Sequence, residues 1–342
     1  MSRFFLRFLA LAAFTLLCAC SSPSNTDGLL ALEGRSMGTT WSVKAVAPGR
    51  NDGELRGAIE RRLDELVQQM SAWEPDSDLS RFHRAPAGTW QKLPDDLYRV
   101  IVHARDLAEK TDGAFDPTIA PLVELWGFGA SGKSRTAPPS REEIEAARSW
   151  IGWQKIQLDP SNQSLLQPGG LSLDINAIGP GYAVDQIGAV LKQQGIENFL
   201  VELGGEMLAS GRRPDGSPWR VAVERPDQSD GDASFDTIVE LDNAAIGSSG
   251  DYRVGFLYQG RRYSHTIDPR TGEPVEHEAA AVSVIAGDAM SADAMAAALL
   301  VLGPKEGLRY AQRRDIAAVF TLRKGKTYKR VATAQFSKML AQ

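Results

Sequence analysis

The chain has 342 residues, of which 43% are hydrophobic and 24% are charged. This balance is typical of a soluble globular protein and argues against a disordered or membrane-embedded chain, and the length allows one large domain or two ordinary ones. The formal net charge of -5 excludes the strongly basic composition with which proteins bind nucleic-acid phosphates. We therefore expect no nucleic-acid partner.

The first twenty residues have the pattern of an export signal. Arg3 and Arg7 give the start of the chain the positive charge of a signal-peptide n-region. The apolar run over residues 8–17 follows, and it is about half as long as a bilayer-spanning helix. The segment ends in Leu-Cys-Ala-Cys, which resembles a bacterial lipobox with Cys20 as the lipidated residue. Two or more acyl chains anchor a protein stably. The alternative is an ordinary signal peptide that is cleaved nearby.

This reading divides the chain into a signal peptide (1–19), a lipidated tether (20–31) and one folded domain (32–342). Cys18 and Cys20 are the only cysteines, so the mature domain has no free thiol. It therefore forms no disulfide and contains no cysteine nucleophile and no cysteine metal site. Any catalysis must use oxygen and nitrogen groups.

Helical periodicity and capping signals predict five helices along the domain. The first begins at Asp52 and runs to Met70, and the second begins at Pro94 and stops at the Asp112-Gly113 turn. Ser140 and Glu143 form a capping-box pattern for a short third helix. The last two are expected over residues 181–194 and 288–314.

Short β-rich segments separated by Gly, Pro, Asn or Asp predict a largely antiparallel sheet over residues 155–267. These segments are KIQLD, SLLQP, LSLDI, NFLVEL, WRVAVE, TIVEL and VGFLYQ. A hairpin with Lys324-Gly325 at its turn follows the last helix. Helices and strands do not alternate strictly, so we expect an α+β fold, one compact unit with two intertwined lobes, rather than a doubly wound sheet.

Four stretches concentrate glycine, hydroxyl and acidic residues: 36–41, 111–129, 171–185 and 287–303. In the second, Phe115, Trp126 and Phe128 either sandwich a heteroaromatic ring or form ordinary core. In the third, Gly179-Pro180-Gly181 opens a helix whose free N–H groups suit a phosphate. That stretch has neither a Walker lysine nor GxGxxG spacing, so no known nucleotide motif applies.

Asp293 and His265 are the candidate chemical groups. Asp293 lies near a helix start, where the dipole is expected to keep its carboxylate ionised, and it is either a ligand for magnesium, which takes oxygen donors, or a plain helix-start residue. His265 precedes the rigid Asp268-Pro269 turn. It is either a structural hydrogen bonder or a general base that deprotonates a hydroxyl nucleophile.

Seven stretches in this order resemble the FAD:protein FMN transferase family, called ApbE, over about residues 32–322: SMGTTW, DGAFDPT, LSLDINAIGPGYAVD, VELGGE, GSSGDYR, YSHTIDPRTGEPV and ADAMAAALLVLG. The resemblance implies a T-fold-like architecture, FAD bound in a cleft, and magnesium. It also implies transfer of FMN through its phosphate to a threonine or serine hydroxyl of a partner protein, with release of AMP.

Carried over by motif, the resemblance implies contacts to FAD from Met37, Trp73, Ala114, Phe115, Asp116, Asp174, Pro180 and Ile267. For magnesium it implies the carbonyl of Ala177, Asp293 and position 297, with His265 and Asp293 as the catalytic residues. The family usually has a charged residue, often lysine, at Pro180 and threonine at Ala297. A methyl group cannot ligate a metal, so we expect weak magnesium binding.

The sequence thus predicts a lipid-anchored flavin transferase that faces the periplasm, on the inner or outer membrane. The expected acceptor class is respiratory flavoproteins exposed to the periplasm. Two alternatives remain open: a magnesium-dependent FAD pyrophosphatase, in which water replaces the acceptor hydroxyl, and a lipid-anchored flavin carrier that does not catalyse. The sequence names neither the acceptor nor the oligomeric state.

Overall fold

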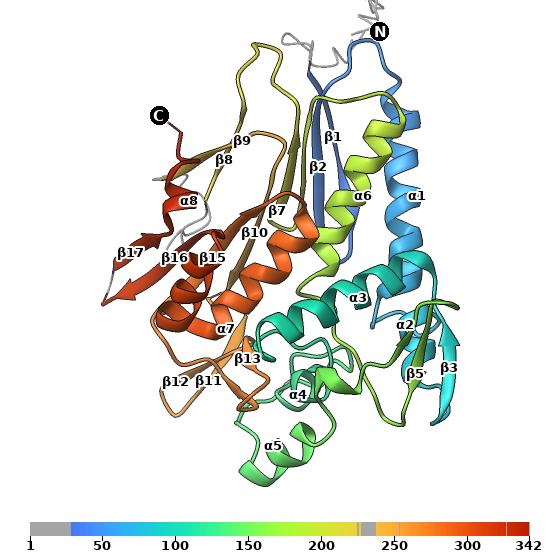
Figure 1. Ribbon diagram of the computed structural model, residues 1–342, viewed down its shortest axis with the longest axis vertical. Coiled ribbons are helices and arrows are strands. Elements are labelled where there is room, and N and C mark those ends of the chain that lie inside the picture. Colours follow the sequence, from blue (N-terminus) through green and yellow to red (C-terminus); the bar gives the residue numbers. More distant parts are fainter. Residues whose placement is uncertain (1–28, 224–225, 227–236, 253, 326, 342) are drawn as a thin grey trace, which may run out of the picture.

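The computed structural model describes residues 29–342 except 224–225, 227–236, 253, 326 and 342. Its centre is an eight-stranded sheet of order β1-β2-β6-β7-β10-β15-β16-β17, in which every neighbouring pair is antiparallel (Figure 1). The strands are β1 (Leu29–Ser36), β2 (Thr39–Val46), β6 (Phe199–Leu203), β7 (Glu206–Ser210), β10 (Ala245–Gly250), β15 (Ala279–Ala286), β16 (Ala317–Lys324) and β17 (Thr327–Ala332).

Four smaller sheets flank the central one. They are formed by β3 (Thr89–Lys92), β5 (Ser164–Gln167) and β4 (Leu158–Asp159); by β8 (Trp219–Ala222) and β9 (Ile238–Leu241); by β11 (Gly255–Tyr258) and β12 (Arg261–Ser264); and by β13 (Ile267–Asp268) and β14 (Glu273–Pro274). The β11–β12 hairpin extends away from the central sheet, at the end opposite the β1–β2 side (Figure 1).

The helices lie along the right-hand side, across the middle and at the bottom of the molecule in Figure 1, with a short one at the left. They are α1 (Asp52–Met70), α2 (Asp78–His83), α3 (Asp95–Lys110), α4 (Ala120–Leu125), α5 (Arg141–Arg148), α6 (Gly179–Gln193), α7 (Ala289–Arg313), α8 (Ala334–Ser337) and the 3₁₀ turn η1 (Trp153–Lys155). Helices α6 and α7 pack on the central strands and on each other.

The predicted helices are confirmed, and their caps explain their ends. In α5 the Ser140 side chain accepts from the Glu143 N–H, and the Glu143 side chain accepts from the Ser140 N–H, which completes the expected capping box. Helix α3 ends where Asp112 and Gly113 both adopt positive φ. The predicted C-terminal hairpin is also present as β16 and β17.

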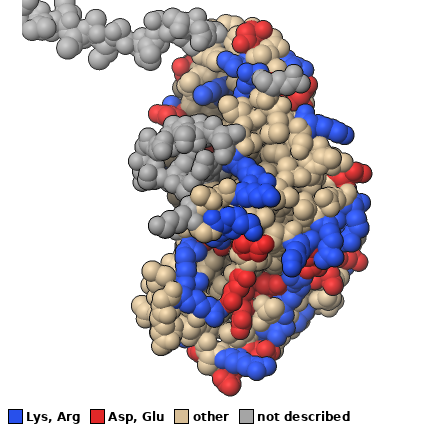
Figure 2. Space-filling model, turned by 90° about the vertical axis from the view of Figure 1, so that its left-hand side faces the viewer, with Lys and Arg blue, Asp and Glu red and all other residues tan. Residues whose placement is uncertain are grey.

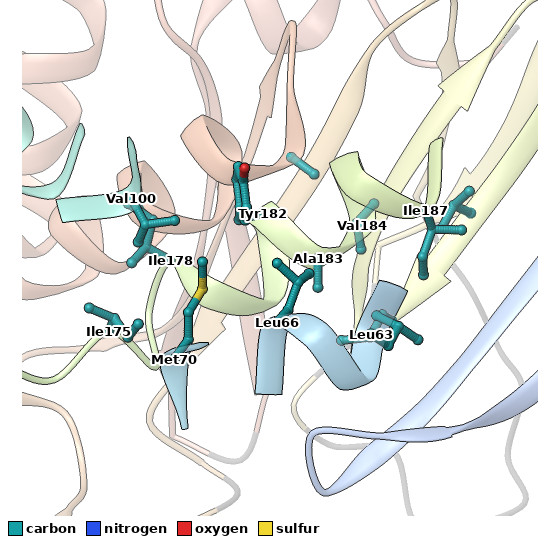
Figure 3. Packing of buried hydrophobic residues seen from close by; sticks show 14 of the residues in the cluster. Leu63, Leu66, Met70, Val100, Ile175, Ile178, Tyr182, Ala183, Val184 and Ile187 are labelled. Atoms are coloured by element: carbon teal, nitrogen blue, oxygen red, sulfur yellow. The ribbon is translucent and has the colours of Figure 1, made fainter. Parts of the chain in front are cut away.

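One main core joins α1 to α6. Figure 3 shows Leu63, Leu66 and Met70 of α1 facing the buried side of α6, where Ala183 and Ile187 lie. Except for Met70, which is 7% exposed, these side chains are at most 1% exposed. The helical spacing of apolar residues predicted this buried face of α1, and its burial stabilises the fold through the hydrophobic effect.

The predicted strand over residues 171–175 is wrong. Its alternating side chains Leu171, Leu173 and Ile175 are buried, but the backbone joins no ladder. Instead the Asp174 N–H donates to the Pro117 carbonyl and the Leu173 N–H to the His83 ring. The alternating apolar residues therefore indicate a buried connecting segment. Its backbone N–H groups find hydrogen-bond acceptors outside a sheet.

The predicted limits of the sheet need correction as well. The KIQLD segment contributes only β4, because Lys155 belongs to η1. The central sheet is not confined to residues 155–267, since β1, β2, β15, β16 and β17 lie outside that range. Strand β1 already includes Leu29, three residues before the expected start of the fold at Leu32.

Helix α7 is broken at Gly303, whose φ of 73° and ψ of 179° are not helical, and Pro304 follows. Proline has no N–H, so the Leu300 carbonyl loses its helical donor. His277 Nε2 replaces that donor at 2.7 Å. His277 thereby caps the C-terminal end of the first half of α7.

Among the described residues, no helix is long and apolar enough to cross a membrane. The expected signal peptide, the lipidated Cys20 and the tether up to residue 28 lie outside the described residues. They stay predictions.

Candidate functional site

A cavity of about 500 Å³ opens between the central sheet, the first half of α7 and the loops around residues 114–128, 174–180 and 248–269. This volume is within the usual range for small-molecule sites. The structure brings most of the sequence-predicted site residues into its wall: Ala114, Phe115, Asp116, Asp174, Ala177, Pro180, His265, Ile267, Asp293 and Ala297.

Asp293 lies where three elements meet. The Gly181 N–H at the start of α6 donates to Asp293 Oδ2 at 2.9 Å. A Cβ on Gly181 would lie 2.3 Å from the Ala289 carbonyl oxygen, and one on Gly247 of β10 would lie 2.4 Å from the Asp293 nitrogen. Only glycine allows these backbones to approach so closely. The Gly181 N–H that the sequence offered to a phosphate is therefore used to hold Asp293.

Burial sets the protonation of Asp293. The side chain lies in a residue that is 4% exposed, and burial raises its pKa to about 7, with Asp185 adding to the rise and the Gly181 N–H opposing it. Desolvation thus outweighs the helix dipole, which was expected to keep this carboxylate ionised, and the group is only partly ionised near pH 7. No ion pair to Asp293 occurs within the described part of the chain.

The start of α7 is held by two further carboxylates. Asp185 on α6 accepts from the N–H groups of Ala289 and Met290 at 2.8 and 2.9 Å. Asp288, the N-cap of α7, accepts from the Ser291 N–H at 2.8 Å. Burial raises the pKa of Asp185 to about 6. Together they fix the first turn of α7 and so the position of Asp293.

The donor set fits magnesium in part. Asp293 offers a buried carboxylate without a basic partner, and the carbonyl-bearing residue Ala177 lines the same cavity. Ala297 adds no oxygen donor from its side chain. Among residues 29–342 as described, no group of three or more His, Cys, Asp or Glu side chains is placed to hold a metal. A magnesium ion here would take most of its ligands from water and substrate phosphate, as this ion usually does.

Asp116 and Asp174 shape the loops of the cavity wall. Asp116 accepts from the Thr118 N–H and hydroxyl and from the Trp153 N–H. Asp174 accepts from the Asn176 N–H at 2.9 Å. Burial raises the pKa of both carboxyl groups. Both side chains therefore hold loop geometry, and their contact with a ligand stays a prediction.

The three predicted aromatic residues divide between wall and core. Phe115 and Phe128 line the cavity. Trp126 is core: it is 2% exposed, its ring stacks on Tyr263 at 5.7 Å and its Nε1 donates to the Gly272 carbonyl. Of the three predicted residues, Phe115 and Phe128 are thus available for an aromatic ligand.

His265 is half-buried at the end of β12 and lines the cavity. Its Nδ1 lies 3.2 Å from the Val254 carbonyl. A carbonyl oxygen only accepts, so Nδ1 carries the proton and Nε2 keeps its lone pair. Burial, and to a lesser degree the nearby Arg262, lowers the pKa of His265. The imidazole is therefore neutral at pH 7 and able to accept a proton.

The segment after His265 is rigid, as its sequence predicted. Asp268 Oδ1 accepts from the Arg270 N–H at 2.9 Å, and the Asp268 carbonyl accepts from the Gly272 N–H at 2.8 Å. The β13–β14 ladder, with the pairs Ile267–Pro274 and Asp268–Glu273, flanks this turn on both sides. The turn therefore anchors the backbone on the C-terminal side of His265.

The structure places two of the predicted residues outside the cavity wall. Met37, at a φ of 50°, forms the β1–β2 turn and packs partly against the main core. The Gly204 N–H beside the cavity donates to the Thr40 carbonyl, which brings that turn near the rim. Trp73 is 56% exposed in the α1–α2 connection. Contacts of Met37 and Trp73 with FAD stay predictions.

The sequence did not identify the strand side of the cavity. This side is formed by residues of β7, β10 and β15, namely Met207, Ile246, Ser248, Ala281 and Ser283. Ser248 and Ser283 share a hydrogen bond of 2.7 Å between their hydroxyls. Apolar strand residues look like core in a sequence, and only the VELGGE and GSSGDYR stretches marked parts of this side.

Comparison with known proteins shows to which family the chain belongs. The model of the ApbE family matches residues 37–320. The FAD:protein FMN transferase of Vibrio cholerae is 36% identical over 97% of this chain and 98% of that protein, and the one of Escherichia coli K12 is 34% identical over 98% and 97%. The crystal structure of the apo flavinyl transferase ApbE of Pseudomonas stutzeri superposes with a TM-score of 0.83 at 42% identity, over 92% of this chain and 97% of that one.

These matches cover both the fold and the segments that build the cavity. A family model that spans the domain and relatives above 30% identity along nearly the whole chain leave no other assignment. The predicted fold class is confirmed by the same structures, since they share the mixed α and β architecture with antiparallel sheets. The chain belongs to the ApbE family.

Proposed function

We propose that this chain is an FAD:protein FMN transferase that uses FAD as donor and a hydroxyl of another protein as acceptor. Relatives with this name align along nearly the whole chain. The observation that carries the proposal is that His265 and Asp293 line one cavity of about 500 Å³. His265 is a neutral histidine whose Nε2 has no hydrogen-bond partner among the described residues, and Asp293 is a buried carboxylate.

The cavity would bind FAD with its diphosphate between these two groups. Phe115 and Phe128 supply flat apolar surface for a ring system. Catalysis of phosphoryl transfer consists mostly of positioning and charge neutralisation rather than covalent chemistry by the protein.

In the reaction, a threonine or serine hydroxyl oxygen of the acceptor attacks the phosphorus of the FMN half. The bond between that phosphorus and the bridging oxygen breaks, and AMP leaves with the electron pair. His265 Nε2 takes the hydroxyl proton as the new phosphoester forms. Because the pKa of His265 is lowered, the imidazole is in its neutral, proton-accepting form at pH 7.

We propose Asp293 and the Ala177 carbonyl as the protein ligands of a magnesium ion. Bound magnesium would neutralise charge on the diphosphate and make AMP a better leaving group. Ionised Asp293 is favoured by a nearby cation, which would offset the burial that now raises its pKa. Ala297 provides no side-chain oxygen, so we expect the affinity for magnesium to be low.

We further propose that the mature protein is lipidated at Cys20 and faces the periplasm. The n-region, the short apolar run and the Leu-Cys-Ala-Cys end support this. Respiratory flavoproteins exposed to the same compartment are the acceptor class that the location favours. Labelling with a radioactive fatty acid, with Cys20→Ala as control, tests the anchor; no label on the wild-type protein would contradict it.

The test of function compares products with and without an acceptor. The enzyme is incubated with FAD, magnesium and a flavoprotein domain bearing a D-G-x-[ST]-G-x-[ST] segment, and the acceptor mass and free AMP are measured. We expect one FMN per acceptor, an equal amount of AMP, and slow AMP release without acceptor. Fast release of FMN and AMP without acceptor would favour the pyrophosphatase, and tight FAD binding with no product would favour the carrier.

A further inference from the structure

The tautomer of His265 depends on one backbone carbonyl. His265 Nδ1 and the His265 N–H both point to the Val254 carbonyl, at 3.2 and 3.3 Å. Val254 lies at the start of the β11–β12 hairpin and is 49% exposed. Packing of the Val254 side chain is therefore not enough to fix the position of its carbonyl. The proton position on the base is therefore only as well defined as the position of this carbonyl.

Arg262 holds that carbonyl from the opposite strand of the hairpin. Its Nη2 donates to the Val254 carbonyl at 3.0 Å, and its Nη1 donates to the Asp251 carbonyl at 2.5 Å. The planar guanidinium can hold both acceptors at once, which a lysine ammonium does less well. Arg262 thus ties the backbone carbonyls of Asp251 and Val254 to β12.

The Asp251 end of this link is fixed in the central sheet. Asp251 is 6% exposed, and its N–H donates to the Ala280 carbonyl at 3.0 Å. Its carboxylate is paired with Arg323 of β16, with Nη1 to Oδ2 at 3.0 Å. The two carbonyls that Arg262 holds therefore link the hairpin to a buried, ion-paired residue.

We propose that Arg262 is a positioning residue for flavin transfer: it holds the Val254 carbonyl so that His265 keeps its proton on Nδ1 and presents Nε2 to the acceptor hydroxyl. The proposal rests on the proposed function. It goes beyond it by naming what orients the base. Arg262 itself acts through Val254 and needs no contact with FAD or acceptor.

The charge of Arg262 has a second effect on the base. The groups that act on the His265 pKa are Arg262, which lowers it, Asp251, which raises it, and burial, which lowers it most. Removing the Arg262 charge should raise the pKa of His265. Because the base works in its neutral form, the acid limb of the rate profile should then move to higher pH.

Two substitutions of Arg262 separate its geometry from its charge. In Arg262→Gln we expect kcat to fall about tenfold or more with the KM for FAD changed less than about threefold, since misplacement of a reacting group affects chemistry more than binding. We also expect the acid limb to shift to higher pH. In Arg262→Lys the charge remains, so the limb should stay near its wild-type position while kcat recovers only in part.

Arg261 is the matched control. It is the neighbouring residue of β12, but it pairs with Glu276 and lies 4.8 Å from the Tyr263 ring centre instead of holding Val254. Figure 2 shows that acidic and basic side chains are intermixed on one face of the molecule. Both side chains of the Arg261–Glu276 pair are exposed, and an exposed ion pair contributes little to stability. Arg261→Gln should therefore leave kcat within about twofold and the pH profile unchanged.

The tautomer can be read without substrate. The chain has four histidines, so a spectrum of protein labelled with ¹⁵N-histidine is simple, and His265→Gln identifies the His265 signals. Above its pKa, wild-type His265 should show Nδ1 protonated and Nε2 unprotonated; Arg262→Gln should show a mixture of tautomers, and Arg262→Lys less of one. Arg262→Gln with wild-type tautomer, kcat and pH profile would overturn the proposal. This spectrum decides the matter even if no acceptor is ever flavinylated, which would count against the proposed function instead.

Discussion

The cavity has two walls of opposite construction. The Asp293 wall, formed by α6, the first half of α7 and β10, is built into the core, and Asp293 is 4% exposed. The His265 wall, formed by the β11–β12 hairpin with Asp251 and Val254, lies at the surface, where Val254 is 49% and Leu257 is 72% exposed. One wall is held by close backbone packing. The other is held by polar contacts and by the packing of Phe256 and Tyr263 against Trp126.

This difference matches two tasks. A wall that neutralises the charge of a diphosphate works best when it is preorganised and poorly hydrated. A wall that receives a hydroxyl from another protein must be open to that protein. Substitutions in the Asp293 wall should therefore change stability and binding together, whereas substitutions in the His265 wall should change chemistry alone.

The largest expected effect is in the His265 wall. His265→Ala should reduce flavin transfer by about 10²-fold or more, because the general base is lost, while the dissociation constant for FAD stays within a few fold and the thermal midpoint is unchanged. Single-turnover transfer, FAD titration and thermal unfolding measure the three quantities. Transfer at the wild-type rate would remove His265 from the mechanism.

Gly181→Ala should show the opposite pattern in the Asp293 wall. The new Cβ would meet the Ala289 carbonyl at 2.3 Å, so we expect a loss of stability of about 1–3 kcal/mol together with weaker FAD binding. Gly179→Ala is the control on the same helix, since its Cβ would meet nothing within 4 Å. Denaturant unfolding of both variants compares them. Equal stability of the two would show that the close approach of α6 and α7 is not needed.

The pKa of Asp293 predicts how this wall responds to pH. The pKa is about 7 in the folded protein against an ordinary value of 3.8, so the stability linked to this group is complete below about pH 4 and is lost as the pH rises through 7. In metal-free buffer, Asp293→Asn should therefore be more stable than the wild-type chain at pH 8, by on the order of 2 kcal/mol.

The check is urea unfolding at pH 5 and pH 8 with a chelator present. Asp185, whose pKa is raised to about 6, has the same sign and should leave a smaller pH dependence in the variant. If the difference between the two proteins did not grow from pH 5 to pH 8, Asp293 would be ionised in the free protein.

The smallest expected effect concerns Ala297. Ala297→Thr places a hydroxyl in the cavity wall beside Asp293 and should raise the apparent affinity for magnesium a few fold. Ala297→Val has nearly the same shape but no oxygen and should not. The magnesium dependence of transfer measures both. A gain in both variants would trace the effect to packing.

Much of the fold could be predicted from local patterns. The helices α1, α3 and α5 follow from periodic apolar residues and capping signals such as Ser140 with Glu143. The segment 171–175 could not, because alternating burial looks the same in a buried loop as in a strand. Nor could the order of the central sheet, since the pairing of β10 with β7 and β15 joins residues far apart in the chain.

The part of the site that sequence motifs identified is the part where those motifs contain polar residues. Asp293, His265 and the residues 114–116 line one cavity as expected. The protonation of Asp293 was not predictable, because it depends on how deeply three elements bury the carboxylate. The strand side with Ser283 and the role of the Val254 carbonyl were also missed, since a backbone atom leaves no mark in a sequence.

The central claim is that both walls act on one FAD molecule. A crystal structure of the chain with FAD and magnesium tests it most directly. We predict the diphosphate beside Asp293 and the FMN phosphorus on the side that faces His265 Nε2, with room for a hydroxyl between them. FAD bound outside the cavity, or with its FMN phosphorus turned away from His265, would contradict the account.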